Sequence, residues 1–171
     1  MEQISVIKKA AFTAVGFQLK TTFAGNRQAS EIPPFFHKTV TEDGLSIVSN
    51  RENEEYLCIF DKKADSPDLD YTIAALAEMP RTDQKDLALV FVPESVYACV
   101  RFSKKGNQDV LKVLKFMMEE WAPENGYSQN HAGKLFIRYD AQFLAAYRAA
   151  GYEGETMAEL YFPVVKQPLT Q

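Results

Sequence analysis

Glu159 is the residue whose type and setting could do chemistry most directly. It lies in an otherwise apolar run, between Ala158 and Leu160 and two residues before Tyr161. A carboxylate buried without a partner is costly, whereas a carboxylate beside aromatic rings attracts a cation through its own charge and through the ring faces. By composition alone, an exposed position on a strand is the favoured interpretation of Glu159, and a counter-charge in a pocket is the alternative.

Aromatic residues are the other candidates for binding chemistry. The chain holds 12 Phe, 8 Tyr and one Trp, many of them in predicted strands and several beside acidic residues. Aromatic side chains on strand faces usually form core, so packing is the favoured explanation for each one taken singly. A ligand pocket requires several of them to converge.

Signatures of catalysis and of bound cofactors are missing from the sequence. The 8 glycines form neither of the common phosphate-binding loops. His37 and His131 have no His or Cys neighbour at zinc-ligand spacing, and a structural role for His37 is favoured over that of an axial haem ligand. No Gly-x-Ser-x-Gly elbow occurs, and no spacing identifies a nucleophile with its base. We therefore expect no cofactor, no metal and no catalytic residue.

The cysteines and the N-terminus predict where the protein resides. Cys58 and Cys99 each lie within an apolar run, as buried small side chains do, which favours a reducing compartment. The first residues lack a basic region followed by an apolar core, and no apolar run approaches the roughly 20 residues that span a bilayer. We expect a cytoplasmic protein with no membrane partner.

The acidic balance bears on the choice of partner. A net charge of -4 and a pI near 5.3 argue against direct DNA binding, which depends on clustered Lys and Arg. An acidic protein suits a positively charged ligand or a basic patch on a partner protein, although mild acidity is also common in cytosolic proteins. The first strand is expected from about Ile4, with no helix-turn-helix before it, so a role in transcription would require a partner.

The elements that position these residues fall into two similar halves, about residues 1–80 and 87–166. In the first half, apolar residues at 15, 17 and 19 predict a strand. Ser30 and the Pro33-Pro34 pair predict the cap and first turn of a short helix that stops near Gly44. Two further strands are predicted over residues 55–61 and 71–78, and a polar connection over 79–86 leads to the second half.

The second half repeats this order of elements. Apolar residues 87–93, a strand over 96–103, a helix over 107–121 and strands over 134–139 and 157–164 are predicted. The packed face of the helix is expected to carry Val110, Val113, Leu114, Met117, Met118 and Trp121. Residues 140–150 have helical spacing as well, and they are predicted to form an additional lid or edge helix.

A succession of short motifs from Leu87 onward is similar to a known family. The carrying residues are Val92-Pro93, Tyr97-Ala98, Gly106, Glu120-Trp121, Pro123, Gly126-Tyr127, Phe136, Tyr139-Asp140 and Glu159-Leu160-Tyr161-Phe162-Pro163-Val164. They follow the family's order over nearly half of the chain, and Val15-Gly16 and Ile32-Pro33 suit its N-terminal half more loosely. The sequence therefore resembles the GyrI-like family, which includes effector-binding domains of AraC/XylS-type and MerR-type bacterial transcription activators.

The resemblance implies a fold and a ligand site. The implied fold class is α+β, a single domain of duplicated strand-helix-strand-strand modules with pseudo-twofold symmetry, a curved antiparallel sheet and a central ligand cleft between the helices. In regulator members that cleft holds hydrophobic, often cationic drugs against aromatic rings and a buried carboxylate. The match of Glu159 to the family's Glu-x-Tyr-x-Pro-Val ending favours the pocket interpretation of this residue. The ligand-binding residues expected here are Glu159, Trp121, Tyr97, Tyr139, Phe136 and Tyr161.

We therefore expect a free-standing, non-enzymatic effector- or drug-binding protein whose small-molecule ligand is an aromatic cation. Two alternatives remain open: a hydrolase of reactive small molecules that uses the same cleft, and a protein-interaction module like the gyrase inhibitors. One departure from the family is visible in the sequence. Many members have Phe-Glu where this chain has Phe136-Ile137, so one family carboxylate is replaced by an apolar side chain.

Overall fold

The computed structural model describes residues 3–77, 86–104, 107–150 and 157–168. Within these ranges, nine strands form one antiparallel sheet. Their bounds are β1 (Ser5–Lys9), β2 (Phe12–Thr22), β3 (Tyr56–Lys62), β4 (Asp68–Leu76), β5 (Ala88–Val92), β6 (Ser95–Ser103), β7 (Tyr127–Gln129), β8 (Leu135–Tyr139) and β9 (Met157–Lys166). The strand order is β1-β6-β9-β8-β3-β4-β2-β5, and β7 pairs with β9.

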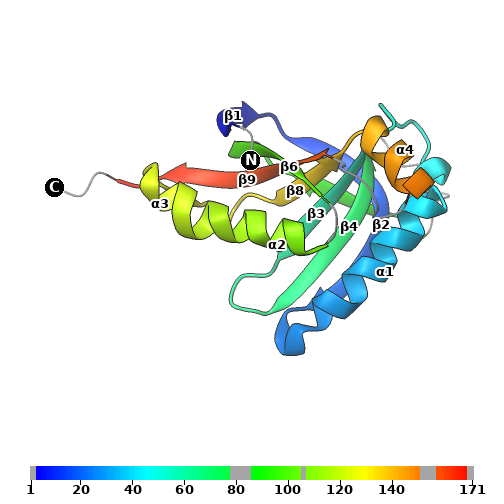
Figure 1. Ribbon diagram of the computed structural model, residues 1–171, viewed down its shortest axis with the longest axis horizontal. Coiled ribbons are helices and arrows are strands. Elements are labelled where there is room, and N and C mark those ends of the chain that lie inside the picture. Colours follow the sequence, from blue (N-terminus) through cyan, green and yellow to red (C-terminus); the bar gives the residue numbers. More distant parts are fainter. Residues whose placement is uncertain (1–2, 78–85, 105–106, 151–156, 169–171) are drawn as a thin grey trace.

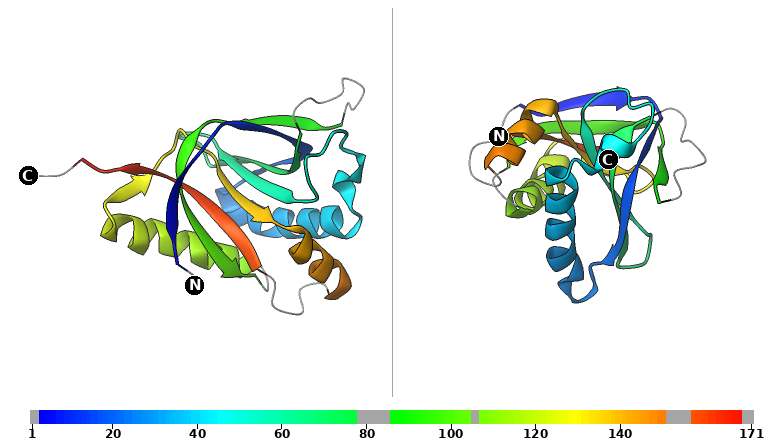
Figure 2. Two further views of the ribbon diagram at one scale, coloured as in Figure 1. Left: turned by 90° about the horizontal axis from the view of Figure 1, so that it is seen from above. Right: turned by 90° about the vertical axis from the view of Figure 1, so that its right-hand side faces the viewer.

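The sheet is strongly curved, which allows two strands that follow each other in the chain to pair near its opposite edges. β1 pairs with β6, whereas β2, which follows two residues later, pairs with β4 and β5 near the opposite edge. Figure 2 shows this long N-terminal ribbon, in blue, crossing over the sheet. Gly16 permits the close approach of β2 to β4, since a Cβ atom there would lie 1.9 Å from the carbonyl oxygen of Ile73.

The helices lie on one side of the sheet (Figures 1 and 2). They are α1 (Arg27–Thr41), α2 (Asn107–Phe116), which continues through a π turn (Met117–Trp121) into α3 (Ala122–Glu124), and α4 (Ala141–Ala150). Helix α4 begins at a true cap, because the Asp140 carboxylate accepts a hydrogen bond of 2.8 Å from the Phe143 amide. The order β2-α1-β3-β4 recurs as β6-α2-β8-β9, with β7 and α4 as additional elements of the second half.

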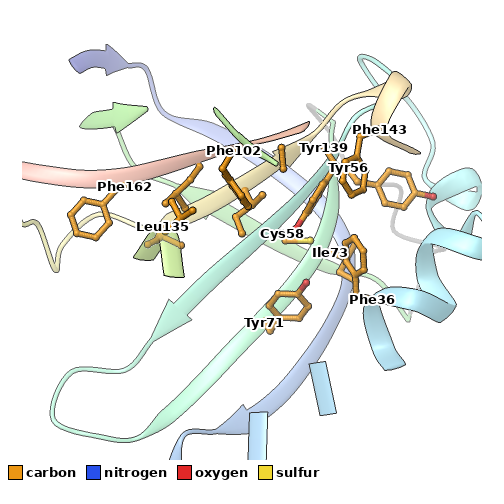
Figure 3. Packing of buried hydrophobic residues seen from close by; sticks show 14 of the residues in the cluster. Phe36, Tyr56, Cys58, Tyr71, Ile73, Phe102, Leu135, Tyr139, Phe143 and Phe162 are labelled. Atoms are coloured by element: carbon orange, nitrogen blue, oxygen red, sulfur yellow. The ribbon is translucent and has the colours of Figure 1, made fainter. Parts of the chain in front are cut away.

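Two apolar clusters occupy the two faces of the sheet. The first lies between the sheet and the helices and includes Phe36, Cys58, Ile137 and Phe143, all at most 2% exposed. Figure 3 shows part of this cluster, with Tyr71, Cys58 and Phe36 near one another below Tyr139 and Phe143. The second lies on the other face, where the curved sheet packs against itself, and its residues are Ala14, Leu57, Ile59, Ala74, Val90, Val92, Tyr97, Cys99, Phe136 and Tyr161. The sheet is therefore buried on both faces over much of its area.

The predicted α+β class and curved antiparallel sheet are confirmed, with two local corrections. Helix α1 begins at Arg27 rather than after Ser30, because Asn26 takes the left-handed conformation (φ 57°) that starts it. Pro33 and Pro34 consequently lie inside the helix rather than in its first turn. The short strand β7 was not predicted.

Other predictions concern single segments. The stretch 140–150 holds a helix as predicted, from Ala141 to Ala150, with Asp140 as its cap. Met118, expected on the packed face of its helix, is 52% exposed. Glu78, residues 79–85 of the predicted connection and Gly106 lie outside the described residues.

Candidate functional site

A cleft between α1 and α2, with strands of the sheet as its floor, is the main candidate for a ligand site. Its volume is about 490 Å³, within the roughly 300–1,000 Å³ typical of small-molecule sites. The residues that line it are Asn26, Gln28, Ala29, Ile32, Pro33, Phe60, Tyr71, Lys104, Val110, Leu111, Ile137 and Tyr139. Among these described lining residues none is Asp or Glu, and Lys104 carries the one positive charge.

Strand alternation decides which side chains reach this cleft. On β8, Ile137 and Tyr139 face the helices and line the cleft, whereas the alternating residues Phe136 and Arg138 face the other way. The same alternation along β6 buries Val100 and Phe102 on the helix side. It brings Lys104, two residues further along, to the floor of the cleft.

Lys104 is an unusual residue for the floor of a cleft, because its side chain ends in a charged group and yet only 3% of the residue is exposed. Its ammonium donates a hydrogen bond of 3.1 Å to the Tyr139 hydroxyl. The same nitrogen lies 3.8 Å from the centre of the Phe36 ring, 4.7 Å from that of Tyr139 and 5.8 Å from that of Phe143. These rings from α1, β8 and α4 form an aromatic enclosure around a cation that the protein itself supplies.

Burial governs the ionisation of Lys104 and of its neighbour Cys58. Loss of water lowers the pKa of Lys104 from 10.5 to about 8, although the nearby Asp109 carboxylate acts in the opposite direction. Lys104 therefore remains mostly protonated at pH 7. Burial raises the pKa of the Cys58 thiol to about 12, so that this thiol is neutral and unreactive at the same pH.

The rim of the cleft is more polar than its floor. The Gln28 amide nitrogen donates a hydrogen bond of 2.8 Å to Asn26, while its carbonyl oxygen is buried without a hydrogen-bond partner in the described part of the chain. A buried acceptor of this kind favours a ligand with a donor group. Ala29 and Leu111, from α1 and α2, are exposed at opposite sides of the opening.

The structure separates the six residues predicted to bind ligand. Tyr139 lines the cleft. Trp121 stacks on Tyr127 beyond the far end of α2, with ring centres 5.6 Å apart. The other aromatic residues, Tyr97, Phe136 and Tyr161, pack against one another on the opposite face of the sheet, where the rings of Phe136 and Tyr161 stack at 4.5 Å.

Glu159 also lies on that opposite face, beside Arg138 and Arg101 on the neighbouring strands. Its carboxylate accepts a hydrogen bond from the Tyr161 hydroxyl and lies 3.7 Å from the Arg138 guanidinium, which also forms an ion pair with Glu55. These carboxylates raise the pKa of Arg138, and burial together with Glu159 raises that of Tyr161. A recess of about 240 Å³ adjoins Glu159, and its walls are mostly charged or polar.

The histidine and the two cysteines that the sequence offered as possible ligands or reactive groups, His37, Cys58 and Cys99, lie in structural positions. His37 lies 2.9 Å from the Tyr147 hydroxyl, which joins α1 to α4. Cys58 and Cys99 are buried and free. Within the ranges that the structure covers, no group of three or more His, Cys, Asp or Glu side chains could hold a metal ion. None of the helices described is both long and apolar enough to cross a membrane.

Of the residues that line the cleft, only Tyr139 was among the predicted ligand-binding residues, and Lys104 is the charged residue that sequence reasoning missed. A signal for it exists, because Ala98, Val100 and Phe102 alternate toward the buried face of one strand and Lys104 continues their series. A lysine on a buried strand face is rare enough to mark a candidate site.

Comparisons with known proteins agree with this fold. None of the curated proteins matches the chain in sequence. Three solved structures share the fold over nearly their whole length: SAV2435 bound to tetraphenylphosphonium (TM-score 0.72, 13% identity, 96% of this chain and 94% of that one), the integron cassette protein VCH_CASS2 from the mobile metagenome of Vibrio cholerae (0.62, 12%, 95% and 95%), and the EcmrR C-terminal domain (0.56, 14%, 96% and 98%). The model of the Cass2 family, described as integron-associated effector binding protein, matches residues 5–164. The chain belongs to this family of effector-binding proteins.

Proposed function

We propose that the protein binds an aromatic or otherwise largely apolar small molecule in the cleft between α1 and α2, as a binding protein rather than an enzyme. The observation that carries the proposal is a cleft of about 490 Å³ with apolar walls from both helices and from the sheet. Polar groups are few and are placed at the floor and the rim. Such a site gains affinity from apolar burial and orientation from a few hydrogen bonds.

Membership of an effector-binding family supports the proposal. SAV2435, whose fold is similar, was solved with tetraphenylphosphonium bound, a molecule with four phenyl rings. We infer a ligand of similar bulk, because aromatic rings suit the walls formed by Phe60, Tyr71 and Tyr139.

The expected positive charge of the ligand rests on Glu159, which adjoins a different space. That carboxylate already faces Arg138 and Tyr161, and its recess is smaller and more polar than the cleft. We therefore assign effector binding to the cleft and keep the cationic ligand as a separate prediction for the Glu159 recess. Loss of tetraphenylphosphonium binding in Glu159→Gln, with the cleft intact, would support that prediction.

A hydrolase is the alternative function of the chain. It would require a base or nucleophile at the bound substrate, and the cleft offers Lys104 and two tyrosines but no carboxylate among its described walls. We therefore favour binding. Turnover of an electrophilic ester that is lost in Lys104→Met or Glu159→Gln would support the enzymatic alternative.

A link to transcription, through a protein partner, is the remaining part of the proposal. It draws on the fold shared with the EcmrR C-terminal domain. A surface that a partner could use is β5, at one edge of the sheet, where Leu89 and Phe91 are 55% and 56% exposed. A pull-down that returns a protein partner and loses it in a Phe91→Lys variant would support this link, and a pull-down that returns none would count against it.

The binding proposal is tested by closing the cleft. Ala29 is exposed on α1 and lines the opening, so Ala29→Trp fills the space without disturbing the core. Titration with the neutral fluorescent dye N-phenyl-1-naphthylamine should show binding to the unmodified protein. Ala29→Trp should lower the affinity for the dye by about tenfold or more, because one ring of the dye would lose its apolar contacts with the cleft.

The matched control is Ser30→Trp, because Ser30 is the next residue of α1, is also exposed and does not line the cleft. It should bind the dye like the unmodified protein. Equal binding by all three proteins would contradict the assignment of the ligand site to this cleft.

A further inference from the structure

The Gln28 side chain, at the rim of the cleft, carries a hydrogen-bond acceptor that the described part of the chain leaves unsatisfied. Gln28 belongs to the first turn of α1 and is one of the residues that line the cleft. Its side-chain oxygen is buried. Nearly all buried acceptors in folded proteins have a donor, because leaving one unpaired costs free energy. This rim therefore has a place for one hydrogen-bond donor.

The neighbour of Gln28 fixes which end of the amide needs a partner. The Gln28 amide nitrogen donates a hydrogen bond of 2.8 Å to the side-chain oxygen of Asn26, which also lines the cleft. Turning the Gln28 amide over would place two oxygens against each other, and a carbonyl oxygen can only accept. The nitrogen therefore stays with Asn26, and the oxygen is the atom that a ligand can satisfy.

The position of Gln28 allows its oxygen to meet a ligand. The residue as a whole is half-buried, and a glutamine amide is carried on three rotatable bonds, so a small rotation turns the oxygen toward a molecule in the cleft. The other walls from the two helices are largely apolar and include Ile32, Val110 and Leu111. Among apolar walls, a single acceptor determines how a ligand with rings is oriented.

We propose that the effector of this protein is an aromatic molecule that carries an N–H donor beside its rings, as an arylamine does, and that Gln28 accepts the hydrogen bond from this group. The proposal rests on the assignment of ligand binding to the cleft and specifies the chemical class of the ligand. It makes Gln28 a specificity-determining residue. The requirement is for the donor, so a neutral amine and a protonated amine both meet it.

Two ligands of nearly the same shape test this proposal. N-Phenyl-1-naphthylamine carries one N–H between its ring systems, and 1-benzylnaphthalene has a CH2 group in the same place. The affinity of the amine is measured by its fluorescence, and that of the hydrocarbon by its displacement of the amine. The two ligands differ in hydration, but this difference is the same for every variant and cancels when variants are compared.

The variant Gln28→Met keeps the length of the side chain, removes the acceptor and suits a helix. It should lower the preference for the amine over 1-benzylnaphthalene by about fivefold to thirtyfold, because the hydrocarbon no longer leaves a buried acceptor unpaired and the amine no longer finds one. The control is Gln142→Met, because Gln142 is exposed on α4 and does not line the cleft. It should leave the preference unchanged.

The outcomes separate this proposal from the one beneath it. If the amine binds and is sensitive to Ala29→Trp, but Gln28→Met has the same preference as the unmodified protein, the role of Gln28 is overturned and the cleft assignment stands. An equal fall of the preference in Gln142→Met would also overturn it. If the amine does not bind, or if Ala29→Trp leaves its affinity unchanged, the cleft assignment fails and the proposed ligand class fails with it.

Discussion

Replacing Lys104 by Met should make the folded protein more stable at neutral pH. Burial lowers the pKa of this lysine from 10.5 to about 8, which corresponds to a cost of about 3 kcal/mol for keeping the charge in the fold. The contacts of the ammonium with Phe36 and Tyr139 offset part of that cost. We therefore expect Lys104→Met to raise the free energy of unfolding at pH 7 by about 1–3 kcal/mol.

The pH dependence of that difference follows from the same pKa values. Between pH 8 and about 10.5 the unfolded chain binds the lysine proton and the folded chain has released it, so the stability of the unmodified protein rises with pH. The variant lacks this rise. Deprotonation of the buried Cys58 and Cys99, whose pKa values are raised to about 12, favours unfolding above pH 9 in both proteins and largely cancels in the comparison.

Urea unfolding at pH 6, 7, 8, 9 and 10, followed by circular dichroism, measures the difference. The advantage of Lys104→Met should be constant up to about pH 8 and should shrink toward zero near pH 10. Lys115→Met, at an exposed position, should show no such trend. A variant that is less stable than the unmodified protein at pH 7, or an advantage that is independent of pH, would refute the reasoning that Lys104 is a charge held in the fold at a cost.

Three further predictions concern Glu159 and two residues that stabilise the fold, Gly16 and Asp140. Glu159→Gln should leave the cleft's affinity for N-phenyl-1-naphthylamine within about twofold in a fluorescence titration, because Glu159 lies on the opposite face of the sheet; a large loss would place Glu159 in the same site. Gly16→Ala should destabilise the fold by about 3 kcal/mol or more in urea unfolding, because the added Cβ would meet the Ile73 carbonyl at 1.9 Å; a value below 1 kcal/mol would mean that β2 and β4 can separate. Asp140→Ala should cost about 1 kcal/mol through loss of the cap on the Phe143 amide, and Asp140→Asn should retain most of it.

Much of the fold follows from local patterns in the sequence. Alternation of apolar and polar residues predicts β2 around Val15 and Phe17, and helical spacing predicts α2 and α4. The start of α1 was missed because it depends on the left-handed backbone of Asn26, a conformation that nothing in its neighbours requires. The strand β7 was missed because Tyr-Ser-Gln is too short and polar to show alternation.

The site was harder to predict, because strand alternation leaves the choice of face open. On β9, Leu160 and Phe162 face the helices while Glu159 and Tyr161 face the other way, and both series are largely apolar. The curved sheet buries both faces, so aromatic content does not distinguish cleft from core. The family resemblance of the β9 ending therefore drew attention to Glu159. Lys104 belongs to no such motif, although it continues the alternation of β6 one residue beyond the strand and so reaches the cleft.

The most direct measurement is a crystal structure of the protein with N-phenyl-1-naphthylamine. We predict density for the rings of the dye between α1 and α2, against Tyr71 and Tyr139. Density for the dye in the Glu159 recess, along β5, or nowhere in the cleft at saturating dye would contradict the assignment of this cleft as the effector site.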